Sequence, residues 1–254
     1  MAGSRTLIGN KIESLFVSFL SEVGSDFKGI FISGGSTGPA LFRSLASNND
    51  FMHALSAVAI GQVDERVVPT DCTDSNTYWF YKDLLDQVDI CLDFRPILTD
   101  EENQELHRCF SGYDVTEEPE RTSMALWKEI TSLADEAASR YSKFVEDTIE
   151  NSIVHLGIGT DGHTASLFPR SKSLDSPKLV DVNFDPTGKN RHIRVTLTFE
   201  ALRRAREVVV VAKGSEKKEV VQRVLTTKES LPASRLLDLK TTWILDREAA
   251  ALIS

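Results

Sequence analysis

The strongest constraint on the fold is the regular alternation of short apolar runs with longer amphipathic stretches. Runs typical of strands occupy residues 29–33, 57–63, 152–159, 192–198, 208–214 and 241–245. Helical spacing of apolar side chains is found at 8–23, 39–46, 75–88 and 126–144, after 198, and from 215. Continuous apolar strands separated by helices favour a parallel sheet that is covered on both faces. The sequence therefore predicts an α/β fold with a single doubly wound, mostly parallel sheet, Rossmann-like in layout.

Nothing in the chain suggests a domain boundary. The 254 residues are 41% hydrophobic, enough for a sizeable core, and no Pro/Gly/Ser-rich linker or internal repeat divides them. We expect one domain over residues 1–254. The first helix is predicted to run from Ile8 to near Gly24, and the acid-rich segment from about Leu98 to Arg121 is predicted to be a solvated loop.

Charge and cysteine usage narrow the class of partner. The net charge of −9 argues against nucleic acid or an anionic membrane as the main partner. Three cysteines without C-x-x-C spacing favour a reducing cytoplasm over a disulfide framework or a zinc site. No apolar run approaches about 18 residues, and polar residues interrupt the N-terminal segment, so we expect neither a membrane span nor a signal peptide. We expect a cytoplasmic monomer.

Three of the predicted strands end in unusual polar sequences. These are SGGSTG from Ser33, DER from Asp64 and GTDGH from Gly159. Ligands of open α/β sheets bind beyond the carboxyl ends of the strands. The three sequences are therefore predicted to converge on one site.

The first of them, SGGSTG, lies between a strand and a helix. Gly34 and Gly35 would let backbone N–H groups approach a phosphate, and Ser36 and Thr37 add hydroxyl donors. The alternative is an ordinary capped turn between strand and helix, and these residues alone do not decide between the two.

The second sequence, VDERVVP, places two acids and an arginine at a strand end. Arg66 has the fork of donors that binds a carboxylate, a phosphate or a developing oxyanion. The competing interpretation is a surface ion pair.

The third sequence, GIGTDGHTASLFP, contains a G-x-G-x-x-G pattern that is also found in dinucleotide-binding loops. Such a loop requires a helix of several turns after its last glycine, but Pro169 follows Gly162 by only seven residues. We therefore favour a glycine turn that presents His163 at a strand end. A purely structural hydrogen bond is the alternative role for one histidine.

A fourth candidate is Lys217 in GSEKK, near the start of a predicted helix. Positive charge is unfavourable next to a helix N-terminus. Lys217 is thus either close to a bound anion or a solvated surface residue.

Taken together, these motifs resemble the 6-phosphogluconolactonases of the glucosamine-6-phosphate isomerase/6-phosphogluconolactonase family. The resemblance is carried by SGGSTGPALF, VDERVVPTDCTDSN, LGIGTDGHTASLFP, RVTLT, AREVVVVAKGSEKKEVVQRVL and LPASRL…TTWILD, from about residue 12 onward. Gly38 replaces the proline usual after SGGST, and Arg170 replaces the glycine usual after SLFP. The N-terminus is shorter than the family's usual first strand requires.

The resemblance implies hydrolysis of a phosphorylated sugar lactone in the oxidative pentose phosphate pathway, without metal or cofactor. It implies that His163 is the base. A histidine can take a proton from water and return it to the departing ring oxygen. Arg66 is the candidate for polarising the carbonyl or holding the lactone end, and Asp161 and Asp64 for orienting His163 or binding hydroxyls. The phosphate is expected at residues 34–37, with Lys217 and Arg194.

Two other functions remain open. Glucosamine-6-phosphate deaminases of this fold resemble D-G-H-I-A-F-N-E-P where this chain has DGHTASLFP, so their glutamate corresponds to Phe168. Sugar-phosphate-sensing domains of some transcription regulators also share the architecture. A regulator needs a helix-turn-helix segment, whereas the N-terminus here has room for one helix.

Overall fold

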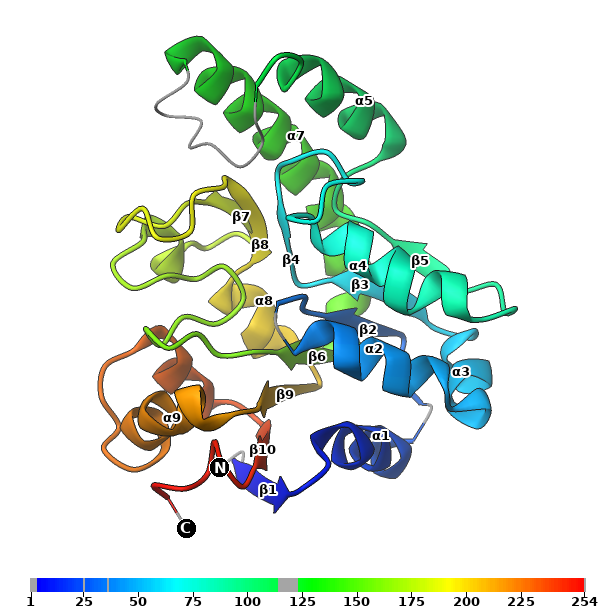
Figure 1. The fold of residues 1–254 in the computed structure, drawn as a ribbon, viewed down its shortest axis with the longest axis vertical. Helices are drawn as coiled ribbons and strands as arrows, with labels where there is room; N and C mark the ends of the chain where they lie inside the picture. Colours follow the sequence, from blue (N-terminus) through cyan, green and yellow to red (C-terminus); the bar gives the residue numbers. More distant parts are fainter. Residues whose placement is uncertain (1–3, 25, 36, 114–122, 254) are drawn as a thin grey trace.

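A computed structural model describes residues 4–24, 26–35, 37–113 and 123–253. Within them, a seven-stranded sheet has the order β1-β10-β9-β6-β2-β3-β5, and every neighbouring pair is parallel (Figure 1). The strands are β1 (Arg5–Gly9), β2 (Gly29–Ile32), β3 (Ala59–Gln62), β5 (Asp93–Arg95), β6 (Ser152–Leu156), β9 (Glu207–Ala212) and β10 (Thr241–Asp246). The predicted α/β fold with a doubly wound parallel sheet is confirmed.

Helices cover both faces of this sheet and give each face its own core. One core contains residues of α1 (Ile12–Val23), α2 (Gly38–Ala46), α3 (Asn49–Leu55) and α4 (Asn76–Asp83). The other contains residues of α5 (Asp100–Cys109), α7 (Met124–Thr148), α8 (Phe199–Arg204) and α9 (Lys218–Leu225). In β9, Val208 and Val210 enter the second core while Val209 and Val211 enter the first, as the period-two alternation of a strand requires.

Short 3-10 segments complete the described elements. They are η1 (Leu85–Gln87), η2 (Ile149–Asn151), η3 (Lys172–Asp175), η4 (Ser215–Lys217) and η5 (Pro232–Asp238). Across the described ranges, no helix combines the length and the apolar character that a bilayer crossing demands.

The order of the strands reverses between β2 and β6. The chain proceeds outward from β2 to β3 on one side, and from β6 to β9 and β10 on the other. The carboxyl ends of β2 and β6 therefore diverge into loops at a topological switch point, where open α/β sheets form their ligand crevice. These two loops are SGGSTG and GTDGH.

A second sheet was not predicted from the sequence. It has the order β4-β8-β7, is antiparallel, and comprises β4 (Asp64–Arg66), β8 (Arg194–Leu197) and β7 (Val180–Asn183). Val63 joins the sheets, because its N–H donates to Ile32 O at 3.1 Å and its carbonyl accepts from Leu197 N at 2.8 Å. The sequences AVAIGQVDER and HIRVTLT read as single strands, and nothing local marks where the chain leaves the parallel sheet.

The N-terminal prediction was wrong in part. Residues 5–9 form β1, which pairs in parallel with β10, so the first strand is present and the helix begins at Ile12 rather than Ile8. β1 is an edge strand with one neighbour, and the Ile8 side chain is 44% exposed. Ile8 precedes Ile12 by four residues, which made it look like part of the helical stripe.

The predicted loop at 98–121 was also wrong over its first part. Residues 100–109 form α5, and residues 114–122 lie outside the described ranges. Thr99 and Glu102 close a capping box, in which each side chain binds the other residue's backbone N–H. The acids that suggested a solvated loop are thus the favourable first turn of a helix. β5, α3 and β7 were not predicted either.

Candidate active site

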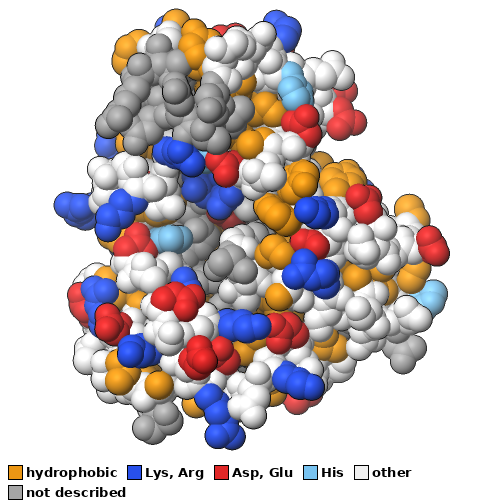
Figure 2. Space-filling model, viewed as in Figure 1, with side chains coloured by type: hydrophobic (Ala, Val, Ile, Leu, Met, Phe, Trp, Pro, Cys, Tyr) orange, Lys and Arg blue, Asp and Glu red, His pale blue; other side chains and the backbone are white. Residues whose placement is uncertain are grey.

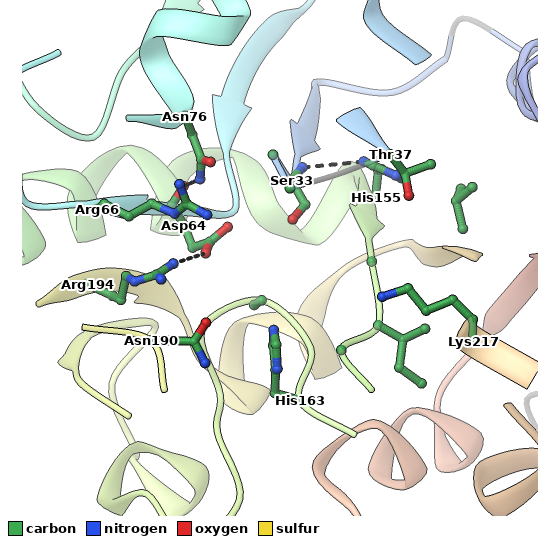
Figure 3. Close-up of a pocket in the computed structure, with 17 residues that line it drawn as sticks. Ser33, Thr37, Asp64, Arg66, Asn76, His155, His163, Asn190, Arg194 and Lys217 are labelled. Atoms are coloured by element: carbon green, nitrogen blue, oxygen red, sulfur yellow. Dashed lines mark hydrogen bonds and ion pairs between the residues drawn. The ribbon is translucent and has the colours of Figure 1, made fainter. Parts of the chain in front are cut away.

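The polar sequences that follow β2 and β6 meet the small sheet in one open pocket of about 200 Å³ (Figure 3). Of the ten residues singled out from the sequence, eight line it: Gly34, Gly35, Thr37, Asp64, Arg66, His163, Arg194 and Lys217. Asp161 lies behind His163 and binds its side chain. Ser36 falls outside the described residues.

His163 stands on a turn that closes on itself. The Gly159 N–H donates to His163 O at 2.9 Å, and the Gly162 N–H donates to Gly159 O at 2.9 Å. A Cβ at position 159 would collide with Nδ1 of His163, so only glycine allows the ring to fold back over the turn. The sequence G-x-D-G-H therefore forms a turn that positions the imidazole, and no helix of the dinucleotide-binding type follows it.

Asp161 fixes the orientation of the His163 ring. Its Oδ1 lies 2.6 Å from Nδ1 of His163 and also accepts from the His163 N–H at 3.1 Å. Burial tends to raise the pKa of Asp161, but the hydrogen bonds and charge of His163 prevail and lower it to about 2. An ionised carboxylate only accepts, so Nδ1 carries the hydrogen and Nε2 is the nitrogen left to exchange a proton.

The small sheet presents three charged side chains to the pocket. Residues two apart in a strand share a face, so Asp64 and Arg66 of β4 point the same way, and Arg194 is paired with Arg66 on the neighbouring strand. Asp64 and Arg194 are buried, with an Arg194 Nη1 to Asp64 Oδ2 distance of 3.9 Å, and Asp64 also accepts from Ser166 Oγ at 2.6 Å. Together they form a largely buried charged cluster, in which Ser166 holds the Asp64 carboxylate.

Two guanidinium groups face each other in this cluster. Burial, together with the charge of Arg66, lowers the pKa of Arg194 to about 10. The Nε atoms of Arg66 and Arg194 are both buried without a hydrogen-bond partner in the described structure. Like charges directly opposite in a strand pair are unfavourable. Buried, positively charged N–H donors that lack a partner are suited to bind an anion, or a group that becomes negative during a reaction.

Glu65 stabilises this part of the site from the face of β4 that points away from the pocket. It points away from Asp64 and Arg66 and is fully buried at the N-terminus of α4. Its carboxylate accepts from the N–H groups of Arg66, Asn76 and Thr77, each at 2.7 Å. An acid at a helix N-terminus is favourable. In D-E-R, the middle acid thus builds the scaffold while its two neighbours face the pocket.

Backbone donors and Lys217 form the other end of the pocket. The N–H groups of Gly34, Gly35 and Thr37 find no acceptor within the described chain, and Thr37 precedes α2. A Cβ at position 34 would collide with Oδ1 of Asn76, so the loop can pass here only as glycine. Lys217 ends η4, and its side chain extends into the pocket between Thr37 and His163, without an ion pair in the described residues (Figure 3). This end has the character of a phosphate site.

Arg194 lies apart from that end. Figure 3 places it beside Asp64 and Arg66, with His163 between this group and Lys217. The sequence grouped Arg194 with Lys217 because both are cations, and strand pairing was needed to separate them.

Among the lining residues that were not singled out from the sequence, three carry an amide or imidazole side chain: Asn76, His155 and Asn190. Asn76 donates from Nδ2 to Asp64 O at 2.8 Å, and its place after Ser75 in D-S-N was an available signal. His155 is buried in β6, where its Nδ1 accepts from Ser33 N–H at 3.3 Å and burial lowers its pKa to about 3. Asn190 lies in an irregular loop that carries no signal.

A search of the described residues found no group of three or more His, Cys, Asp or Glu side chains suited to hold a metal ion. A histidine–carboxylate pair among cationic side chains, at the switch point of a parallel sheet, defines an α/β enzyme site for an anionic small molecule. The Glucosamine-6-phosphate isomerases/6-phosphogluconolactonase family matches residues 10–243, and the chain belongs to this family.

Similar proteins agree with this assignment. A Mycobacterium tuberculosis protein named 6-phosphogluconolactonase is 33% identical over 227 residues, covering 87% of this chain and 83% of its own length. A Bos taurus protein of the same name is 30% identical over 247 residues, covering 92% and 84% respectively. The solved structure of 6-phosphogluconolactonase from Trypanosoma cruzi has a TM-score of 0.77 at 25% identity and covers 100% of this chain and 98% of its own.

Proposed function

We propose that this chain hydrolyses 6-phospho-D-glucono-1,5-lactone to 6-phosphogluconate, the second step of the oxidative pentose phosphate pathway. The observation that carries the proposal is the pair of His163 and Asp161, mounted on a glycine turn between two cationic groups of side chains. The family and the names of the relatives support the same substrate.

Nε2 of His163 acts as general base. It takes a proton from water as the water oxygen bonds to the lactone carbonyl carbon, and Asp161 stabilises the imidazolium that forms. Arg66 stabilises the tetrahedral oxyanion, with Arg194 and Asp64 fixing the charge around it. When the intermediate collapses, the bond from the carbonyl carbon to the ring oxygen breaks. His163 then returns its proton to that oxygen and the acid is released.

The phosphate occupies the opposite end of the pocket. The N–H groups of Gly34, Gly35 and Thr37 bind its oxygens, Ser36 is proposed to add its hydroxyl, and Lys217 supplies the charge. Arg194 is buried beside Asp64, away from this end of the pocket, so it contributes a positive potential rather than a direct phosphate contact (Figure 3).

Phe168 argues against the deaminase of the same family. It stands where the deaminase motif has a glutamate, is buried, and has its ring 5.0 Å from the ring of His163. The conversion of an amino sugar to a ketone with loss of ammonia needs several proton transfers. A phenyl ring cannot relay a proton, whereas lactone hydrolysis needs only the histidine.

The test is a pair of assays on the purified chain. Proton release from freshly prepared 6-phosphogluconolactone, corrected for spontaneous hydrolysis, should be accelerated, and glucosamine 6-phosphate should release no ammonia. Ammonia release at a comparable turnover, lost on His163→Ala, would reassign the activity to the deaminase. A non-catalytic binder would bind 6-phosphogluconate without accelerating either reaction.

We further propose that residues 1–254 work as a single domain and a monomer in the cytoplasm. The three cysteines are free thiols, as a reducing compartment would leave them. Sedimentation equilibrium at assay concentrations tests the monomer.

A further inference from the structure

Asn190 lies in the loop between β7 and β8, where Asp185 fixes its position. Asp185 is buried, with 4% of its surface exposed. Its Oδ1 accepts from the Thr187 N–H and the Thr187 hydroxyl, each at 2.8 Å. Its Oδ2 accepts from the Asn190 N–H at 3.2 Å and from Asn190 Nδ2 at 2.8 Å. A single carboxylate thus organises the loop and holds both the backbone and the side chain of Asn190.

This arrangement decides which atom of the Asn190 amide is turned to the pocket. Burial would raise the pKa of Asp185, but its hydrogen bonds to Thr187 and Asn190 lower it, so the carboxylate is ionised at neutral pH. An ionised carboxylate accepts and never donates, so the NH₂ group must face Asp185. Oδ1 is left on the pocket side, next to His163 and Arg194, with no hydrogen bond from the described residues (Figure 3).

Neutral amide acceptors are few in this pocket, and Asn76, whose Nδ2 donates to Asp64 O, is the other asparagine of the lining. Arg66, Arg194 and Lys217 all present donors, and the Asp64 carboxylate is already bound by Ser166 and Arg194. A phosphate or an oxyanion has no hydrogen to offer Oδ1 and would be repelled by it. A sugar hydroxyl can donate, so the chemistry of Asn190 selects the hydroxyl-bearing part of a substrate.

The position of Asn190 singles out one hydroxyl. The proposed function places the phosphate on C6 at Lys217 and residues 34–37, and places C1 at His163. In the lactone ring, the carbon bonded to C1 on the side away from the phosphate is C2. Asn190 lies on this side of His163 (Figure 3). We propose that Asn190 is a specificity-determining residue whose Oδ1 accepts a hydrogen bond from the C2 hydroxyl of the lactone. The proposal rests on the proposed lactonase function.

The test compares 6-phosphogluconolactone with its 2-deoxy analogue, prepared by oxidation of 2-deoxyglucose 6-phosphate. Asn190→Ala should lower kcat/KM for the parent lactone about 10- to 100-fold, the range expected when a substrate hydroxyl loses its hydrogen-bond partner in the closed complex. For the 2-deoxy lactone the same substitution should change kcat/KM by less than about threefold, because the partner hydroxyl is already missing.

Thr187→Val is the matched control. It removes a hydrogen bond from the same Asp185 carboxylate while leaving Asn190 in place, so it should reduce kcat/KM for both lactones by one common, small factor. Asp185→Asn is a second variant that keeps Asn190. An amide at 185 no longer dictates which way Asn190 turns, so the preference for the parent lactone should fall, though less than in Asn190→Ala.

Equal losses on both lactones in Asn190→Ala, or no loss on either, would overturn the assignment of Asn190 while leaving the lactonase function intact. A wild-type chain that opens neither lactone faster than water overturns the function and the role of Asn190 with it. Should Asn190→Ala unfold, the Asp185→Asn variant decides, since an unchanged preference for the parent lactone also contradicts the proposal.

Discussion

His163 and Lys217 stand on loops that follow strands of the large parallel sheet, whereas Asp64, Arg66 and Arg194 are side chains within strands of the small antiparallel sheet. The loop residues are partly exposed and depend on few neighbours. The strand residues are mostly buried and interact with one another, and the charge of Arg66 helps to lower the pKa of Arg194. Figure 2 shows a view of the surface in which Lys, Arg and acidic side chains are interspersed. We therefore expect substitutions in loops to change mainly activity, and substitutions in the small sheet to change activity and stability together.

The largest effect on rate is expected at His163. His163→Ala should lower kcat about 10²- to 10⁴-fold, the usual contribution of a positioned proton transfer, and lower the free energy of unfolding by only about 1 kcal/mol, because Asp161 loses its side-chain partner. Steady-state kinetics and urea unfolding measure the two quantities. His53→Ala, an exposed histidine on α3, is the matched control and should alter neither. A folded His163→Ala protein with normal kcat would remove His163 from the mechanism.

Asp64→Ala tests the small sheet. It removes the acceptor of the Ser166 hydroxyl and leaves the Arg194 guanidinium without its carboxylate, so the chain should lose about 3 kcal/mol of stability as well as most of its activity. Asp64→Asn keeps an acceptor for Ser166 and should be destabilised less. If Asp64→Ala were inactive but as stable as wild type, the contrast between the two sheets would disappear.

Arg66→Lys should lower kcat/KM about 10- to 100-fold, because an ammonium group cannot reproduce the guanidinium fork that both reaches Asp74 O and faces the pocket. Arg95→Lys serves as the control, since Arg95 is an exposed residue of β5 that pairs with Asp93. Full activity of Arg66→Lys, measured with fresh lactone, would exclude an oxyanion-binding role.

Lys217→Ala should act on binding rather than on chemistry. We expect KM and the Kd of 6-phosphogluconate to rise about tenfold with kcat within twofold, since a phosphate contact is equally present in substrate and transition state. Lys218→Ala makes the same charge change one residue on, outside the pocket lining, and should have little effect. Normal product affinity in a calorimetric titration of Lys217→Ala would make Lys217 a surface residue.

The smallest effect is expected at Arg170, in the loop beyond His163. Its φ of 66° lies in the left-handed region, which explains why glycine is usual at this position of the family motif. Arg170→Gly should stabilise the protein by up to about 1 kcal/mol, the relief of strain less the entropy that glycine adds to the unfolded chain. Arg170→Ala keeps the strain and should give no gain in Tm, and both variants should remain fully active.

The sequence was sufficient for what depends on local chemistry. His163, Arg66 and the glycines of residues 34–35 were found because turns and strand ends carry recognisable residues, and their convergence was predicted because all three sequences follow predicted strands. What failed depends on distant partners. Residues 5–9 are a strand only because β10 lies beside them, and the small sheet exists only because residues 64–66 meet residues 194–196. A hydrogen bond to Asp185 fixes the orientation of Asn190, and no sequence motif indicates that these two residues pair.

Arg66 and Arg194 face each other across two strands, and this makes the fold itself responsive to ligand. The charge of Arg66 is unfavourable to the buried Arg194 guanidinium, and we expect an anion bound beside them to offset part of this cost. Binding at 100 times Kd adds about 2.7 kcal/mol to the unfolding free energy by mass action. The Tm of the protein should therefore rise with the fraction of chains that hold ligand. Its lifetime in a cell should then depend on the concentration of the metabolite that it binds.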